Sequence, residues 1–459
     1  MVSENIKMYK NKHICILGLG YVGLTLAVTL ADVGFKVLGV EIRDDILSLI
    51  ANGKSHFYEP GLDKKLQRLI RSGDLVFSKD IPKNLNINTY IITVGTPLSS
   101  DRRTRLDMIK AATKQVANKL KSDDLVIMRS TVKIGVTRNI VETILNKVGC
   151  EYNLAFCPER TLEGNALEEL KSLPQIIGGS TYASALRASE LFQFLTQTIV
   201  RVSNIETAEL IKLIDNAQRD VSFAYANEVA RACDAIGVSA IEVIEAGKQG
   251  YSRTNLPMPG PVGGPCLEKD SYILSEGLLE YGFEPEITLV SRRANEKQPE
   301  ETIKYLEGIT SNLNDFNKTP TITLLGVAFK GKPATDDLRG TMAKPVLNSL
   351  KKYFPNGHFR AYDAVVSSAE LENFGLEPVK TLKEAFLKSS LVIIMNNHNT
   401  FSSMYIEDLA KLMKNPGVIY DFWNFYKTAD LKLPKGIIYS ALGSHGLANL
   451  PLKASLNEV

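Results

Sequence analysis

Short apolar runs alternate with helical patterns along the first part of the chain. Ile14–Leu17 leads into a glycine-rich turn and a helix of small and apolar residues at 24–33, and a second run, Lys36–Val40, follows. Runs of this length that alternate with helices are typical of a parallel sheet covered on both faces. Further runs lie at 90–94, 125–128 and 152–156. We therefore predict a doubly wound domain.

In the middle of the chain the apolar residues take on helical spacing. One long helix is predicted from Ser203 to Ile236, with Ser203 or Asn204 suited to cap it and Gly237 to end it. Shorter helices are predicted at 240–247 and after Cys266. Such a compact helical segment commonly joins two lobes and forms a dimer. The apolar positions of the long helix are Leu210, Ile214, Ala217 and Val221.

The strand pattern returns after a polar linker at 312–320. We predict an α/β protein in which two doubly wound, Rossmann-like domains are joined by a central helical domain. The second sheet has no glycine fingerprint, so we expect it to bind something other than a second dinucleotide. Its predicted strands are 321–327, 358–362, 391–395, 418–421 and 437–440, and the predicted domains are 1–202, 203–310 and 311–459.

The glycine-rich turn after the first strand predicts a dinucleotide site. The turn follows a strand and opens a helix, and Glu41 ends the next strand about 20 residues later. The pyrophosphate would meet the helix N-terminus. Glu41 favours NAD because a carboxylate repels the ribose phosphate of NADP, whereas Arg43 works in the opposite direction. The alternative is a glycine turn without a ligand. The predicted contacts are Gly18, Gly20, Tyr21, Val22, Gly23, Glu41 and Arg43.

The composition favours a cytoplasmic protein that acts on small molecules. Of the 459 residues, 44% are hydrophobic and 23% are charged, and a net charge of +3 is too small to indicate a nucleic-acid partner. The polar segment Met1–His13 and the lack of a long apolar run indicate no membrane segment. Five scattered cysteines have neither metal-ligand nor disulfide spacing, so we expect no metal.

Polar residues follow several predicted strands, where open α/β sheets bind their ligands. Thr96 and Thr131 are candidate cofactor or site contacts, although each also suits a turn or a helix cap. Glu159 lies in a short loop after the run at 152–156. Acids in such loops are usually solvated, but the position at a strand end makes Glu159 a candidate site residue.

The stretch Gly263-Gly264-Pro265-Cys266 predicts a reactive cysteine. Pro265 suits the first position of a helix, where unpaired N–H groups and the helix dipole favour a thiolate. Asp270 lies four residues on, on the same helix face. A nucleophilic sulfur with a carboxylate one turn away indicates covalent catalysis at a carbonyl carbon. The alternative is a small buried cysteine after a loop.

Two pairs of basic or amide side chains are further candidates. Lys212 and Asn216 lie four residues apart on the long helix and face the same way, so they are suited to hold an oxyanion. The alternative is a polar helix face in water. Lys330 and Arg339 bracket the first strand-end loop of the second sheet, a suitable place for phosphates or a carboxylate.

Together these motifs resemble those of the UDP-sugar 6-dehydrogenases over nearly the whole chain. The resemblance implies that the C6 alcohol of a nucleotide sugar is oxidised to a carboxylate with two NAD. A hemithioacetal on Cys266 would hold the aldehyde between the two oxidations, and water would cleave the resulting thioester. The matching motifs are GLGYVG from Gly18, Ser130-Thr131-Val132, Pro158-Glu159, Lys212 with Asn216, GGPCLEKD from Gly263 and AFKGKPATDDLRG from Ala328.

The resemblance also implies roles for individual residues. Cys266 matches the nucleophile, Lys212 and Asn216 the oxyanion donors, and Asp270 a group that supports proton movement beside them. Glu159 and Thr131 match residues that position and activate water, and Arg253 matches an arginine donated across a homodimer formed by the central domain. The C-terminal domain matches a UDP-binding domain. The remaining implied substrate contacts are Arg160, Glu163, Gly263, Lys330 and Arg339.

Two loops indicate the sugar. Members acting on UDP-glucose have Pro-Glu-Phe-Leu and Gly-Phe-Gly-Gly-Ser-Cys, whereas Arg160-Thr161 and Asn255–Pro261 look more like members acting on N-acetylated sugars. Glu163-Gly164 follows the glucose pattern. We favour UDP-N-acetylmannosamine or UDP-N-acetylglucosamine, with UDP-glucose as the alternative. A single-step hydroxyacid dehydrogenase would not need Cys266, and a non-catalytic NAD sensor would need neither Cys266 nor the paired donors.

Overall fold

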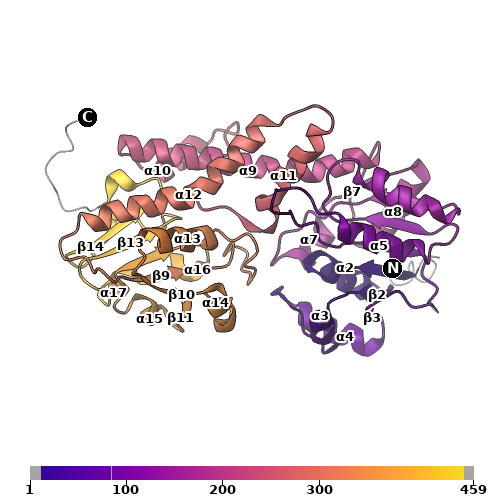
Figure 1. Ribbon diagram of the computed structural model, residues 1–459, viewed down its shortest axis with the longest axis horizontal. Helices are drawn as coiled ribbons and strands as arrows, with labels where there is room; N and C mark the ends of the chain where they lie inside the picture. The colour runs from indigo at the N-terminus through magenta and orange to yellow at the C-terminus, as the bar shows by residue number, and fades with distance from the viewer. Residues whose placement is uncertain (1–11, 84, 449–459) are drawn as a thin grey trace. The chain divides into compact units, whose positions relative to one another are not determined.

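The computed structural model describes residues 12–83 and 85–448 and contains two sheets with helices on both faces (Figure 1). This confirms the predicted α/β class with two Rossmann-like sheets. The described chain forms two compact units. One consists of the residues up to Ala217 together with Lys269–Pro285, and the other of Gln218–Glu268 together with the residues from Glu286 onward. Most of the polar N-terminal segment, residues 1–11, lies outside the described part.

The first unit contains an eight-stranded sheet with the order β3-β2-β1-β4-β5-β6-β7-β8. Neighbouring strands are parallel except for β6 and β7. The predicted strands are present within two residues at each end. Three strands of this sheet were not predicted: the edge strands β3 and β8, which are partly exposed, and β7, which is buried but short and ends in two glycines. The strands are β1 (His13–Leu17), β2 (Lys36–Val40), β3 (Leu75–Ser78), β4 (Thr89–Ile92), β5 (Leu125–Met128), β6 (Asn153–Phe156), β7 (Gln175–Gly179) and β8 (Ile199–Val202).

Successive strand residues of this sheet enter two separate cores, one on each face. Ile14 and Ile16 belong to one core, and Cys15 and Leu17 belong to the other. The sheet is therefore buried on both faces, as parallel sheets usually are. The first core includes side chains of α2 (Tyr21–Asp32), α3 (Asp44–Ala51), α4 (Leu62–Ser72), α7 (Ala166–Ser172) and α8 (Tyr182–Phe192). The second includes side chains of α5 (Asp107–Ala117), η1 (Thr137–Glu142) and α6 (Thr143–Leu145), which η2 (Asn146–Val148) follows.

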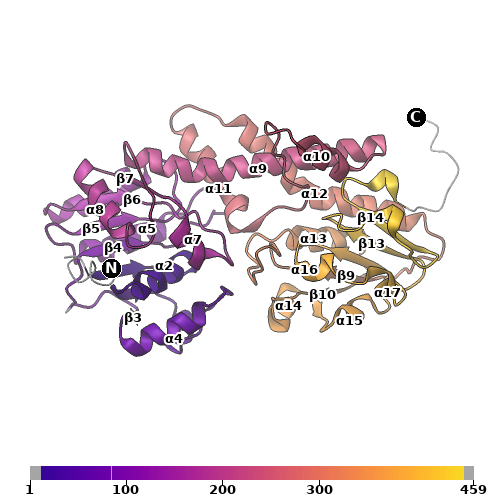
Figure 2. The same ribbon diagram turned by 180° about the vertical axis from the view of Figure 1, so that it is seen from behind.

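The second unit contains a six-stranded parallel sheet with the order β11-β10-β9-β12-β13-β14. Figure 2 labels four of its strands, β10, β9, β13 and β14. The strands are β9 (Thr321–Leu325), β10 (His358–Tyr362), β11 (Glu377–Pro378), β12 (Leu391–Ile394), β13 (Gly417–Asp421) and β14 (Ile437–Ala441). One core includes side chains of α12 (Glu286–Ser311), α13 (Ala343–Tyr353) and α14 (Ser368–Phe374). The other includes side chains of α15 (Leu382–Phe386), α16 (Asn399–Ser402) and α17 (Ile406–Ala410). Two short turns, η3 (Thr428–Asp430) and η4 (His445–Leu447), complete the unit.

An acidic residue after β10 closes the loop that follows β9. The Asp363 carboxylate accepts hydrogen bonds from the backbone N–H groups of Val327 and Ala328, at 2.6 and 3.1 Å, and from those of Val365 and Val366, at 2.9 and 3.0 Å. Asp363 therefore binds the two loops of its own sheet to each other.

The long helix α9 (Ile205–Ile236) is present as predicted, and Asn204 caps it by accepting a 2.8 Å hydrogen bond from the N–H of Thr207. α10 (Ala240–Lys248) and α11 (Gly264–Leu279) follow, also as predicted. Within residues 12–83 and 85–448, none of the helices combines the length and the apolar character that crossing a bilayer requires.

Candidate active site

The turn between β1 and α2 has the backbone that a dinucleotide pyrophosphate needs. Gly18 has a φ of +92°, and a side-chain carbon at Gly23 would lie 1.8 Å from the carbonyl oxygen of Gly18. Both positions therefore require glycine. Gly20 is the N-cap of α2, no side chain caps the helix there, and a side-chain carbon at Gly20 would meet nothing within 4 Å. The N-terminus of α2 is thus open to an anion.

Glu41 lies at the edge of this turn. Its carboxylate is 8% exposed and accepts hydrogen bonds from the N–H groups of Leu19 at 2.9 Å and Arg43 at 3.1 Å. The Arg43 guanidinium binds the exposed carboxylate of Asp45. Arg43 is therefore held by another acid, and Glu41 is held beside the glycine turn, where it is suited to bind ribose hydroxyls. These residues fit NAD.

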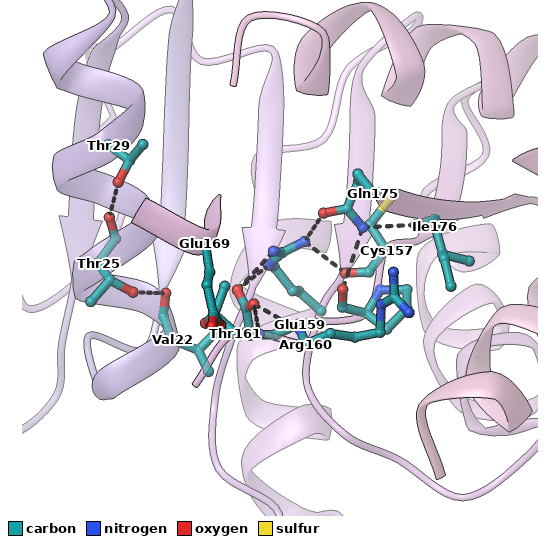
Figure 3. Close-up of polar contacts among 12 residues, drawn as sticks. Val22, Thr25, Thr29, Cys157, Glu159, Arg160, Thr161, Glu169, Gln175 and Ile176 are labelled. Carbon is teal, nitrogen blue, oxygen red and sulfur yellow. Dashed lines mark hydrogen bonds and ion pairs between the residues drawn. The ribbon is translucent and has the colours of Figure 1, made fainter. Parts of the chain in front are cut away.

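Tyr21 joins the glycine turn to the loop after β6. Its hydroxyl donates to the carboxylate of Glu59, and the N–H of Gly164 donates to Tyr21 Oη at 2.6 Å and to Glu59 Oε2 at 2.8 Å. Burial and the Glu59 carboxylate raise the pKa of Tyr21. The sequence predicted Tyr21 as a cofactor contact but gave no sign of Glu59. In the next residue, the carbonyl of Val22 accepts a 3.2 Å hydrogen bond from Thr25 (Figure 3).

Glu159, in the loop after β6, is held by four hydrogen bonds. Oε2 accepts from Nε and Nη2 of Arg129, at 3.1 and 2.7 Å, and Oε1 accepts from the N–H groups of Arg160 and Thr161, both at 2.8 Å (Figure 3). Burial alone would raise the pKa of Glu159, but Arg129 and these N–H groups lower it below its usual range. Glu159 is therefore an ionised carboxylate with weak basicity.

Arg129 is a site residue that the sequence analysis did not select. It is 3% exposed, and its Nη1 donates to the carbonyl of Cys157 at 3.0 Å and to Oε1 of Gln175 at 2.8 Å. A charged residue directly after the four apolar residues of β5 was an available signal, since a buried charge requires a partner. Arg129 thus joins the ends of β5, β6 and β7.

The remaining loop residues contact neighbouring elements. Arg160 donates to the carbonyl of Pro174 at 2.8 Å and lies 3.4 Å from the carboxylate of Asp215 on α9. Glu163 is half-buried in the same loop. The Thr96 hydroxyl donates to the carbonyl of Thr131 at 2.5 Å, which connects the loops after β4 and β5.

Lys212, Asn216 and Asp270 are buried, so the alternative of a polar helix face in water is wrong for the first two. Asn216 Nδ2 donates to Asp270 Oδ2 at 2.6 Å, and Lys269 Nζ donates to Asp270 Oδ1 at 2.6 Å. Lys212 has no hydrogen bond or ion pair within the described part of the chain. A buried ammonium without a partner is costly, and such groups concentrate at functional sites.

Glu209 lies one turn before Lys212 and was also missed. Its carboxylate accepts hydrogen bonds from the N–H groups of Gly135 at 2.6 Å and Thr137 at 2.9 Å. Burial raises the pKa of Glu209 to about 7. Through these contacts α9 holds the loop that carries Thr131.

In the second unit, two glycines place Cys266 at the start of α11. A side-chain carbon at Gly263 would lie 2.3 Å from the carbonyl oxygen of Gly340, and one at Gly264 would lie 2.4 Å from the ring of Phe329. The N–H of Gly264 also donates to the Gly340 carbonyl at 2.7 Å. Cys266 is exposed in the first turn of α11, so the alternative of a buried packing cysteine is wrong.

A pocket of about 660 Å³ lies beside this turn in the second unit and is lined by Gly263 and Arg339 among others. Two predicted substrate contacts therefore share one pocket. The Arg339 guanidinium binds the carboxylate of Asp337, with Nη2 and Oδ2 2.6 Å apart. Lys330 lies over the ring of Phe329 at 5.3 Å, and Arg253 is exposed, 5.5 Å from the ring of Tyr251.

Comparison with known proteins shows similarity to one family along most of the chain. The UDP-glucose/GDP-mannose dehydrogenase family matches with its NAD binding domain over residues 12–196, its central domain over 206–297 and its UDP binding domain over 323–428. A UDP-N-acetyl-D-mannosamine dehydrogenase from Methanococcus vannielii is 31% identical over 425 residues, 89% of this chain and 92% of that protein.

Two solved structures are similar over nearly the whole chain. The UDP-D-ManNAc dehydrogenase from Pyrococcus horikoshii has a TM-score of 0.83 and 30% identity and covers 95% of this chain and 100% of its own. The UDP-glucose dehydrogenase from Pyrobaculum islandicum has a TM-score of 0.83 and 25% identity and covers 94% and 98%. The match to an NAD binding domain confirms NAD as the cofactor.

We predict that NAD exceeds NADP in kcat/KM by at least about tenfold, a difference of about 1.4 kcal/mol, because Glu41 opposes the ribose phosphate. Glu41→Gln should narrow this ratio by about the same factor. Steady-state rates with each cofactor measure it, and Asp44→Asn, which removes a nearby exposed charge, is the control. Equal kcat/KM values in the wild-type protein would show that Glu41 does not select the cofactor.

Proposed function

Because the chain belongs to the UDP-glucose/GDP-mannose dehydrogenase family, we propose that it oxidises the C6 alcohol of a UDP-sugar to the carboxylate through a thioester on Cys266. The observation that carries this proposal is the exposed Cys266 in the first turn of α11, one helical turn before a buried carboxylate, Asp270. Family membership also argues against the single-step hydroxyacid dehydrogenase and the non-catalytic sensor.

The glycine turn and Glu41 would hold NAD, which would supply the hydride acceptor for each of the two oxidations at C6. Cys266 adds through its sulfur to the C6 aldehyde, and the hemithioacetal keeps the aldehyde on the enzyme. The second oxidation gives the thioester. Water then adds to the thioester carbonyl, the C–S bond breaks, and the carboxylate and the Cys266 thiol are released. The overall change consumes one alcohol, two NAD and one water, and it yields one carboxylate, two NADH and three protons.

The residues of the first unit serve this chemistry by binding and orienting. Lys212 is a buried cation without a partner in the described chain, and Asn216 is oriented by Asp270, so the two are suited to stabilise an oxyanion on C6. We assign Glu159 to shaping its loop and not to taking a proton, because its oxygens are occupied and its pKa is lowered. Thr131 then orients water at the end of β5.

For the sugar we propose a UDP-N-acetylhexosamine, with UDP-N-acetylmannosamine first. The proposal is supported by the loops at Arg160-Thr161 and Asn255–Pro261 and by the M. vannielii and P. horikoshii relatives, which are named for that sugar. UDP-glucose stays the alternative because the P. islandicum protein, named for that sugar, is similar over the whole chain. Arg339, Lys330 and Gly263 would contact the UDP end of the substrate.

We also propose a homodimer formed by the central segment, residues 203–310, between domains at 1–202 and 311–459, with Arg253 reaching the partner's site. Half of the exposed large hydrophobic residues of the described chain fall within 214–290, which supports an interface there. The exposed large hydrophobic residues within 214–290 are Ile214, Tyr225, Ile236, Val238, Val243, Tyr251, Leu279, Tyr281, Phe283, Ile287 and Val290.

A cytoplasmic location is expected because NAD and UDP-sugars are cytoplasmic metabolites.

Cys266→Ser should lower the rate of acid formation by at least about a hundredfold without unfolding the protein, because serine does not supply a thiolate at neutral pH. Absorbance of NADH and a thermal melt measure the two effects. Cys150→Ser, at the half-buried cysteine of the same chain, should retain activity. Near-normal acid formation by Cys266→Ser would disprove covalent catalysis.

A UDP-N-acetylhexosamine should exceed UDP-glucose in kcat/KM by at least about tenfold, which about 1.4 kcal/mol supplies. A pocket that hydrogen-bonds the acetamido group leaves polar groups unpaired when that group is absent. Initial NADH formation with UDP-ManNAc, UDP-GlcNAc, UDP-GalNAc and UDP-glucose under the same conditions decides it. UDP-glucose as the best substrate would overturn our interpretation of both loops.

Ile287 and Val290 lie three residues apart on α12 and are 72% and 57% exposed. Replacing both with Glu should convert a dimer into a monomer, since two charges would enter the apolar interface. Sedimentation of the purified protein at about 10 µM measures the mass, because interfaces of obligate dimers persist at that concentration. Tyr405→Glu, outside the segment, is the control. A wild-type monomer would contradict the proposal.

A further inference from the structure

The turn that carries Cys266 has little hydrogen bonding of its own. Pro259, Pro261 and Pro265 have no N–H group to donate. Three glycines lie between these prolines, and glycine has the greatest backbone freedom. A segment of this composition does not fix its own shape, so neighbouring elements must hold it in place if Cys266 is to have a defined position.

The first end of the turn is held by Asn227 of α9. Its Oδ1 accepts the N–H of Gly260 at 2.9 Å, and its Nδ2 donates to the carbonyl of the same residue at 3.1 Å. Asn227 is 1% exposed, and Gln298 and Asn295 of α12 hold its amide with further hydrogen bonds of 3.0 and 3.1 Å. The Asn227 side chain therefore binds both the backbone N–H and the backbone carbonyl of Gly260.

The second end is held by Arg292 of α12. Its Nη1 donates to the carbonyl of Leu267, the residue after Cys266, at 3.0 Å, and to Oδ1 of Asp220 at 3.0 Å. The side chains of Arg292 and Asp220 are 2% and 0% exposed. Asn295 Nδ2 also donates to Asp220 Oδ1, at 2.8 Å. The Asn295 amide thus joins the two holding groups into one buried network within the second unit.

We propose that Asn227 and Arg292 are positioning residues for the nucleophile, because they hold the backbone at Gly260 and Leu267 and so fix Cys266 between them. Both side chains act on Cys266 through the backbone of the turn. This inference rests on the proposed function of Cys266. Removing either contact lets the sulfur move relative to C6, and a displacement of about 1 Å can cost a hundredfold in rate.

Two variants test the network from its two ends. Asn227→Ala removes the contact with Gly260. Arg292→Lys keeps the positive charge beside Asp220 but loses the planar guanidinium whose Nη1 donates to both Asp220 and the Leu267 carbonyl. Thr310→Val is the matched control, because Thr310 is 3% exposed on the same helix and, among the described residues, its hydroxyl bonds to carbonyls of α12 alone. Each full-length variant is assayed for kcat, KM, NAD affinity, thermal melting and the rate at which iodoacetamide alkylates Cys266.

We expect kcat to fall by about tenfold to a hundredfold in Asn227→Ala and Arg292→Lys. The alkylation rate of Cys266 should fall by about threefold or more, because the sulfur is no longer held over the helix N-terminus. The Kd for NAD should stay within about twofold, since Glu41 and the glycine turn belong to the other unit. Thr310→Val should retain all of these values.

The outcomes separate this inference from the proposed function. Wild-type kcat and alkylation in both folded variants, with Cys266→Ser inactive, would overturn the positioning role alone. A parallel loss of NAD affinity, melting temperature and activity in Arg292→Lys would show that the network only stabilises the fold. That result would overturn the positioning role as well. Activity retained by Cys266→Ser would instead refute the proposed function. If Asn227→Ala does not fold, the result with Arg292→Lys decides.

Discussion

A polar side chain buried on a helix needs a partner, and this requirement along α9 organises the candidate site. Glu209, Asn216, Asp220 and Asn227 are all buried on that helix. Glu209 binds the loop after β5, and Asn216 binds the carboxylate of Asp270 on α11. Asp220 binds the guanidinium on α12, and Asn227 binds the beginning of the turn that carries Cys266. Lys212 is the exception, since it is buried beside them without a partner in the described chain. One helix therefore holds the loops, and the lack of a partner for Lys212 in the described chain agrees with its proposed role toward an oxyanion.

Arg129 and Glu159 form a buried ion pair. A carboxylate at a strand end can therefore hold a loop in place and does not have to act as a base. Loss of one member of such a pair typically costs about 3–5 kcal/mol, because the other charge remains buried and unpaired. The same ion pair lowers the pKa of Glu159 and so makes it a weaker base. The resemblance alone implied a water-activating acid, whereas the contacts favour a carboxylate that fixes the loop holding Arg160 and Glu163.

Local patterns predicted the architecture, and long-range contacts escaped them. The strands beside the glycine turn could be predicted from short runs of apolar residues. The helix α9 could be predicted because its apolar residues recur at helical spacing. The candidate residues Cys266, Lys212 and Asn216 were likewise found from motif and spacing. Glu59 could not be found, since its bond to Gly164 joins residues 105 positions apart and no local pattern marks it. The partners of Asn227 depend on how α9 packs against α12, which the sequence does not specify.

Each sheet has an acid at the same topological point. Glu41 follows β2, the neighbour of β1, and Asp363 follows β10, the neighbour of β9. The hydrogen bonds of the two carboxylates differ. An ionised carboxylate offers about four lone-pair sites. Glu41 gives two of them to backbone N–H groups and keeps about two for hydroxyl groups from outside, whereas Asp363 gives all four to its own loops. The free acceptor capacity of the carboxylate, and not the topology, thus distinguishes the sheet proposed to bind the ribose from the sheet whose acid is fully used by its own loops. If a redesign introduced a glycine-rich turn into the second sheet, all lone-pair sites of the Asp363 carboxylate would still be occupied by backbone N–H groups.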